Sequence, residues 1–107
     1  MKTIKYKYEF SKLKRKTFTT IRMNNQEIKS GEIVCHKTLE QKFKAECVGY
    51  GTIRFKNIPP KVLIDDMDLE IVKSKNIYKQ ALDFMKEFYK DIEMDSDVYI
   101  YNFRKCE

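Results

Sequence analysis

The sequence is poor in residues that break or cross-link a chain, and it has no long apolar run. Its 107 residues include 3 glycines, 2 prolines, 3 cysteines and no tryptophan. So little glycine and proline excludes a collagen-like repeat and a long flexible linker. No apolar run approaches the ~20 residues of a transmembrane helix. The first ten residues, MKTIKYKYEF, alternate charged with aromatic side chains. We therefore expect no signal peptide, no membrane partner and a cytoplasmic protein.

The cysteines carry little information. They are odd in number and lack CxxC spacing, which argues against a disulfide framework. Cys35 precedes the only histidine, His36, and neighbouring residues of a strand point to opposite faces. The two are thus poorly placed to share a metal ion or to form a nucleophile–base pair. The sequence predicts no metal site and no cofactor.

Charge is distributed unevenly along the chain, whose formal net charge is +6. Residues 1–22 contain eight lysines and arginines and a single acidic residue, Glu9. Residues 62–97 contain five basic and ten acidic residues. A basic end on a near-neutral body indicates an anionic partner. The competing interpretation is a solvated basic surface that aids solubility.

Alternation of apolar and polar residues predicts five strands in what we expect to be a single domain, 1–107. The predicted strands are 3–10, 17–22, 32–36, 43–55 and 98–103. A short basic turn, 11–16, separates the first two. Gly49 and Gly51 indicate a bulge or bend in the fourth strand. Both faces of the last strand are largely apolar, so we expect it in the centre of a sheet.

Two helices are predicted between the fourth and fifth strands. A helix over 74–90 is indicated by apolar residues at helical spacing, and Ser74 or Asn76 can cap it. Pro60 can open a shorter helix at its first position. Strands followed by helices and a closing strand favour an α+β fold. We expect a small β-barrel of about five to six strands with one long and one short helix packed on it.

Two segments resemble the signature of the ASCH domains, small members of the PUA-like barrel superfamily. They are 14–22, KRKTFTTIR, and 29–34, KSGEIV. A following strand at 43–46, a helix ending at Phe88-Tyr89 and the apolar closing strand extend the resemblance over nearly the whole chain. Lys14 stands where the family usually has glycine. One extra residue before Ile21-Arg22 leaves either Thr19 or Thr20 as the family threonine.

The resemblance implies a PUA-like β-barrel and a ligand cleft between that barrel and the helices. Its strand 17–22 would line the cleft, and the ligand would be RNA or a nucleotide. Basic side chains would neutralise phosphates, threonine hydroxyls would form hydrogen bonds, and a tyrosine would stack on a base. The nucleic-acid-binding candidates are Lys14, Arg15, Lys16, Thr17, Thr19, Thr20, Arg22 and Tyr50. Each can instead be an ordinary strand, surface or packing residue.

An amidohydrolase acting on a modified nucleoside is the alternative that the resemblance implies. ASCH members that hydrolyse acetylated cytidine pair the motif lysine and threonine with a glutamate just before the long helix. The catalytic candidates here are Lys16, Thr20 and Glu70, although Glu70 lies about a turn early. A lysine near a carboxylate can act as a base, and a threonine hydroxyl can attack an amide carbonyl.

Two further classes stay open. The acidic residues of 65–70 suit a metal-dependent nuclease, although a solvated acidic cluster explains them equally well. The charge asymmetry also suits a protein-interaction module, for which the sequence names no protein partner.

Overall fold

The computed structural model describes residues 1–71 and 76–106. Within them the fold is α+β, as the sequence predicts. The strands are β1 (Thr3–Lys5), β2 (Thr17–Arg22), β3 (Ile33–Lys37), β4 (Lys42–Arg54) and β5 (Asp97–Lys105). The helices are α1 (Pro60–Met67) and α2 (Ile77–Met85), with the 3₁₀ turns η1 (Ser11–Lys14) and η2 (Phe55–Asn57).

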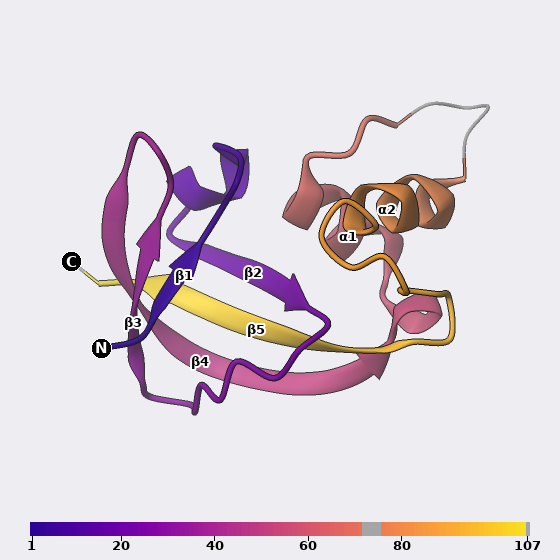
Figure 1. Ribbon diagram of the computed structural model, residues 1–107. Coiled ribbons are helices and arrows are strands. Elements are labelled where there is room, and N and C mark those ends of the chain that lie inside the picture. The colour runs from indigo at the N-terminus through magenta and orange to yellow at the C-terminus, as the bar shows by residue number, and fades with distance from the viewer. Residues whose placement is uncertain (72–75, 107) are drawn as a thin grey trace.

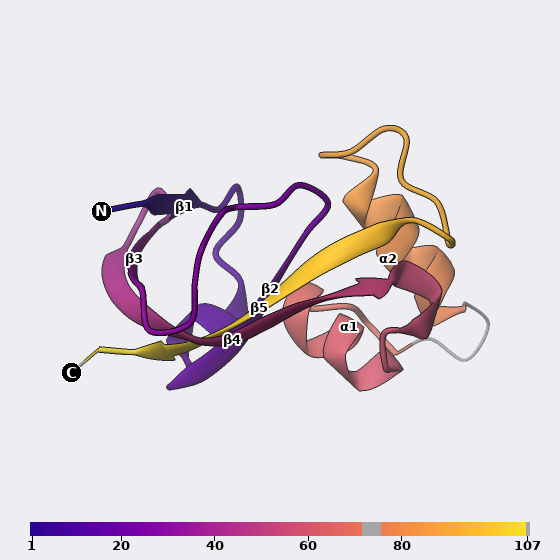
Figure 2. The same cartoon turned by 90° about the horizontal axis from the view of Figure 1, so that it is seen from below.

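The five strands form one curled sheet in the order β1-β3-β4-β5-β2. β1 runs parallel to β3, and every other pairing is antiparallel. The sheet curls into a half-barrel, and both helices lie where β4 ends and β5 begins, far from β1 and β3 (Figures 1 and 2). The predicted barrel is therefore confirmed as a barrel-like sheet. Neither described helix is long and apolar enough to span a membrane.

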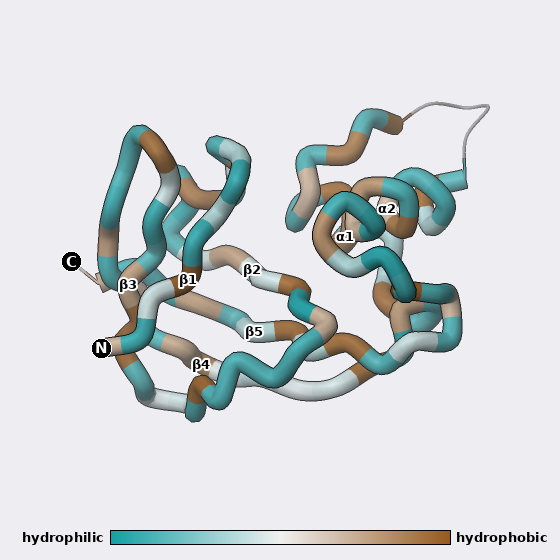
Figure 3. The backbone as a smooth tube through the Cα atoms, in the orientation of Figure 1, coloured by the Kyte–Doolittle hydropathy of each residue, from teal (hydrophilic) through white to brown (hydrophobic). Residues whose placement is uncertain are grey.

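β5 separates two cores, one on each of its faces. Tyr101 and Phe103 pack inside the curl with Phe18 of β2, whereas Val98 packs under the helices with Ile21. Apolar stretches lie along β5 and in both helices, and the segment that joins β2 to β3 is mostly hydrophilic (Figure 3). The predicted central position of the last strand is confirmed, because β5 lies between β4 and β2.

The long strand β4 contains the predicted irregularity. Its pairing with β5 shifts between Cys47 and Gly49, so that Val48 has no partner in the ladder. A bulge of this kind bends a strand and increases its twist. β4 thus follows the curl of the sheet over 13 residues.

The first strand is shorter than its alternation predicts. β1 ends at Lys5, because its partner β3 ends at Lys37 and no other strand in the described residues pairs with β1. The alternation still predicts correctly that the side chains of Ile4 and Tyr6 are buried. Tyr8 was expected on the buried side, and it is 37% exposed.

The helices follow their sequence signals in part. Pro60 opens α1 as predicted, and Asn76 caps α2, with its Oδ1 accepting from the backbone N–H of Tyr78 at 2.8 Å. The other predicted cap, Ser74, lies outside the described residues. α2 ends at Met85, five residues before the predicted end at Lys90.

The basic turn 11–16 is also different from the expectation. Its first part is the 3₁₀ turn η1, which buries Leu13 completely and leaves Lys12 only 3% exposed. One lysine of the segment predicted to be a short basic turn therefore lies inside the protein.

Candidate functional site

A cleft of about 360 Å³ lies between the open edge of the curled sheet and the helices. We call it the main cleft. The end of β1 and the chain after it, η1, β2, α1, α2 and the chain after α2 all contribute to it. Its basic residues are Lys5, Lys7, Lys12 and Arg22. Its aromatic residues are Tyr6, Phe10, Phe84, Phe88 and Tyr89. The rest of the lining consists of Thr20, Ile21, Asp66, Met67 and Met85.

A buried ion pair lies at the floor of the main cleft. The Nζ of Lys12 is 3.0 Å from the Oδ1 of Asp66, and the two residues are 3% and 5% exposed. The ammonium also lies 5.5 Å from the ring centre of Tyr6 and 5.2 Å from that of Phe10. Burial lowers the pKa of Lys12, and the neighbouring Asp66 carboxylate opposes that shift.

The Lys12 ammonium uses only one of its N–H donors in the hydrogen bonds of the described residues. An ammonium carries three N–H donors. Across 1–71 and 76–106, Asp66 Oδ1 is the single hydrogen-bond acceptor that Lys12 contacts. The two remaining N–H groups therefore have no acceptor oxygen among the described residues, and Lys12 lines the main cleft. Such a group favours a ligand that brings an oxygen acceptor.

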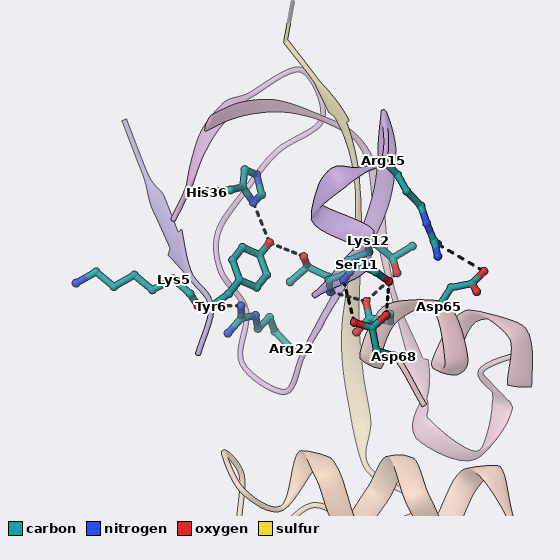
Figure 4. A network of polar contacts seen from close by, with 12 residues as sticks. Lys5, Tyr6, Ser11, Lys12, Arg15, Arg22, His36, Asp65 and Asp68 are labelled. Carbon is teal, nitrogen blue, oxygen red and sulfur yellow. Dashed lines mark hydrogen bonds and ion pairs between the residues drawn. The ribbon is translucent and has the colours of Figure 1, made fainter. Parts of the chain in front are cut away.

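Polar contacts join η1 and its flank to the end of α1 (Figure 4). Asp68 ends α1 in the left-handed conformation, and its carboxylate accepts from the backbone N–H and the hydroxyl of Ser11. Arg15 lies 3.9 Å from Asp65. With the Lys12–Asp66 pair, these contacts bind the basic turn to the acidic cluster. The interpretation of that cluster as solvated is therefore wrong for Asp66, which is buried, and incomplete for Asp68.

The burial of Asp66 follows from its place on α1. Residues three and four apart share one face of a helix. Asp66 lies three residues after Leu63 and directly before Met67, and both of those side chains are buried. It therefore lies on the inner face of α1, where Thr19 of β2 also donates to its Oδ1 at 2.8 Å. The spacing is a signal that sequence reasoning missed.

Side chains bridge the two edge strands of the half-barrel. The hydroxyl of Tyr6 lies 2.8 Å from Thr20 Oγ1 and 2.8 Å from His36 Nδ1 (Figure 4). Arg22 donates from Nη2 to the backbone oxygen of Lys5 at 3.3 Å, and its guanidinium lies over the Tyr6 ring. Burial raises the pKa of Tyr6, so its phenol stays protonated at neutral pH.

His36 lies at the inner end of this network. Its ring stacks on Phe43 and meets Phe103 edge-on at a centroid distance of 4.4 Å. Burial, with Lys12 and Arg22 as further contributors, lowers the pKa of His36 to about 4. The imidazole is therefore neutral at pH 7. Its buried Nε2 has no hydrogen-bond partner in the part of the chain that the structure describes.

The mouth of the main cleft combines positive charge with aromatic rings. Lys5 and Lys7 are exposed and Arg22 is half-buried, while Asp66 is the one carboxylate of the lining. Lys7 lies 5.9 Å from the ring centre of Phe88, which is 44% exposed and packs edge-on against Phe84. An anion near the mouth thus meets three cations beside an accessible aromatic wall.

The structure does not bring the candidates for nucleic-acid binding together in one site. Thr20 and Arg22 line the main cleft. Lys14 and Lys16 are exposed and do not belong to its lining. A second pocket is lined by Arg15, Thr17 and Thr19 among others. Tyr50, on β4, is 53% exposed and stacks on Tyr101 with a centroid distance of 5.9 Å; it lines neither pocket.

The catalytic candidates are not brought together in the main cleft. Of Lys16, Thr20 and Glu70, only Thr20 lines it. Glu70 is exposed beyond the end of α1. The lysine and carboxylate that pair in the cleft are Lys12 and Asp66. Nothing in the sequence distinguishes Lys12 from its basic neighbours.

The described residues contain no group of three or more His, Cys, Asp or Glu side chains arranged to hold a metal ion. Of the acidic residues of α1, Asp66 pairs with Lys12 of η1, and Asp65 lies 3.9 Å from Arg15. No protein-family model, no curated protein and no solved structure matches the chain. Its function is therefore proposed from the geometry and charge of the cleft.

Proposed function

We propose that the protein is an RNA-binding module with an ASCH-like, PUA-like fold, and that its main cleft holds one unstacked nucleotide. The observation that carries this proposal is the buried Lys12 ammonium, which has two N–H groups without an acceptor in residues 1–71 and 76–106 and lies at the floor of a basic, aromatic cleft. An oxygen of the ligand would complete its hydrogen bonding.

The floor offers both donors and acceptors to a polar ligand. Lys12 presents donors, Asp66 presents acceptor oxygens, and Thr20 has a hydroxyl that can serve as either. A base edge or a ribose hydroxyl carries the complementary groups. Recognition of unpaired bases through such edges is typical of single-stranded RNA binding, since duplex stacking hides the bases.

The mouth offers the other two components of a nucleotide site. Lys5, Lys7 and Arg22 are placed to neutralise phosphates and release their counterions. Phe84 and Phe88 supply an aromatic wall, and base–aromatic stacking stabilises a complex by about 1–3 kcal/mol per base. Phosphate contacts position the strand but read little sequence.

Salt-dependent binding tests the proposal. Fluorescence anisotropy would measure the affinity of a labelled single-stranded RNA of about eight nucleotides at several salt concentrations. The cleft variant is Lys5→Gln/Lys7→Gln, and the control is Lys29→Gln/Lys44→Gln, which removes two exposed lysines that line neither pocket. Loss of two phosphate contacts lowers the slope of log affinity against log salt by about 1.4.

We expect the cleft variant to bind more weakly with this reduced slope, and the control to resemble the wild type. Equal slopes for the cleft variant and the wild type would contradict binding at the mouth of the cleft. A DNA strand of the same sequence tests the preference for RNA, because the 2′-hydroxyl distinguishes the two.

An amidohydrolase acting on a modified nucleoside, such as acetylated cytidine, is the second candidate. The observation that favours it is the lysine of lowered pKa next to a carboxylate and close to Thr19 and Thr20. A larger neutral fraction makes a lysine a better base. In this reaction Lys12 would replace the predicted Lys16, and Asp66 would replace Glu70.

Chromatography of reaction mixtures tests this second candidate. Wild-type protein and Thr20→Val are incubated with acetylcytidine, and cytidine is measured. Product formed by the wild type and lost in Thr20→Val would support hydrolysis. No product at high protein concentration, together with RNA binding, would leave the binding module as the function.

A further inference from the structure

A second pocket of about 590 Å³ has Lys12 of the buried ion pair in its lining. It lies between η1 with its flank, β2, α1 and the bulged part of β4. Lys12 lines both this pocket and the main cleft, and Thr19, which donates to Asp66, lines the second pocket. Lys12, the basic partner of the buried ion pair, is therefore common to the linings of both pockets.

Polar groups on the wall of the second pocket are available to a ligand. The Asn102 carboxamide is exposed on β5 and has no hydrogen-bond partner within 1–71 and 76–106. Arg15 approaches Asp65 only to 3.9 Å, beyond hydrogen-bond distance, and its side chain is 49% exposed. A carboxamide and a guanidinium together present both donors and acceptors.

The bulge of β4 keeps this pocket open. Gly49 pairs with Asn102, and residues directly opposite each other in a ladder share one face of the sheet. A Cβ at Gly49 would therefore point to the side of the Asn102 carboxamide, and it would meet no atom within 4 Å. The unpaired Val48 adds an apolar wall that is 48% exposed.

We infer that the second pocket binds a second nucleotide of the RNA strand whose first nucleotide lies in the main cleft. This inference rests on the proposed function. A base fits between the apolar wall and the polar groups, since its edge carries both donors and acceptors. Arg15 lies where it can contact the phosphate or stack on the base. The shared Lys12 has donors for either nucleotide.

The test asks whether changes in the second pocket weaken the binding of a longer RNA and leave the binding of a single nucleotide unchanged. Isothermal titration would give the affinities of a mononucleotide and of a trinucleotide for the wild type, Gly49→Val, Asn102→Ala and the control Gly51→Val. Gly51 is also in β4, has nothing within 4 Å of a built Cβ and lines neither pocket. Thermal unfolding would confirm that each variant folds, and Asn102→Ala serves if Gly49→Val does not.

We expect Gly49→Val and Asn102→Ala to weaken trinucleotide binding about tenfold. A loss of this size is expected when one base no longer stacks or forms hydrogen bonds through its edge. Their mononucleotide affinity and both affinities of Gly51→Val should stay at the wild-type values. Wild-type trinucleotide affinity in the folded pocket variants would overturn the second nucleotide site while leaving the main cleft intact. If the wild type binds neither ligand, the proposed function fails, and this inference fails with it.

Discussion

The Nζ of Lys12 lies 3.0 Å from the Oδ1 of Asp66, and this pair joins two segments of opposite charge that are 54 residues apart. Lys12 belongs to the basic first 22 residues, and Asp66 belongs to the acidic part of the chain. The fold thus neutralises part of the charge asymmetry internally. What remains at the mouth of the main cleft is the positive charge of Lys5, Lys7 and Arg22.

Breaking this pair from one side should destabilise the protein strongly. Lys12→Met leaves the Asp66 carboxylate buried with Thr19 as its remaining donor, and Asp66→Leu leaves the ammonium buried without a counterion. Each change should lower the free energy of unfolding by about 3–5 kcal/mol. Urea unfolding at pH 7 measures these losses.

The double variant Lys12→Met/Asp66→Leu separates stability from function. It removes both charges, so it should be more stable than either single variant. It should also lose RNA binding, because the floor donors are gone. A double variant whose loss equals the sum of the single losses would show that the two side chains do not interact.

The neutral state of His36 makes folding sensitive to pH. The pKa of His36 falls from 6.5 to about 4 on folding, so between these values the unfolded chain binds a proton that the folded protein excludes. The free energy of unfolding should therefore decrease as the pH falls from 6.5 to 4, by about 3 kcal/mol for this residue.

The variant His36→Phe isolates that contribution. Phenylalanine suits the surrounding rings and cannot bind a proton, so its stability should fall less over the same pH range. Denaturant unfolding at pH 7, 6, 5 and 4 compares the two proteins. Parallel pH curves would mean that His36 does not titrate differently in the two states.

The hydroxyl of Tyr6 should stabilise the folded protein, because it joins Thr20 of β2 to His36 of β3. Tyr6→Phe leaves Thr20 and His36 Nδ1 buried without this partner. An unsatisfied buried group costs about 1–3 kcal/mol, so the thermal unfolding midpoint should fall clearly. Tyr50→Phe removes an exposed hydroxyl that has no hydrogen-bond partner among the described residues and should change the free energy by less than about 0.5 kcal/mol.

The start of α2 can be tested through its cap. Asn76 Oδ1 accepts from the backbone N–H groups of Tyr78 and Lys79 at 2.8 and 3.4 Å. Asn76→Ala should therefore lower the free energy of unfolding by about 1 kcal/mol. Asn57→Ala, at an exposed asparagine without a hydrogen-bonded side chain in the described chain, is the matched control. Equal stability of the two variants would count against a helix that begins at Ile77.

The sequence predicts the elements of the fold well where local patterns decide them. Pro60, Asn76 and the bulge at Gly49 mark their elements, because caps, prolines and bulges act within a few residues. The end of β1 depends instead on where β3 stops pairing. That limit is set by tertiary structure, and the alternation of Tyr6, Tyr8 and Phe10 contains no sign of it.

The candidate site was predictable only in part. Two residues of the motif strand, Thr20 and Arg22, line the main cleft. The choice of lysine was not predictable, since Lys12, Lys14 and Lys16 look alike in a short basic turn and only the docking of η1 against α1 buries Lys12. The burial of Asp66 could have been predicted, because its spacing from Leu63 places it on the buried face of α1.

The most direct test of RNA binding in the main cleft is a map of amide chemical shifts. ¹⁵N-labelled protein is titrated with a short single-stranded RNA, and the shifts are followed residue by residue. We predict that the largest changes fall on Tyr6, Lys12, Arg22 and Phe88, which line the main cleft. Changes confined to residues outside its lining, such as Lys29 and Lys44, would contradict the account, as would no change at all.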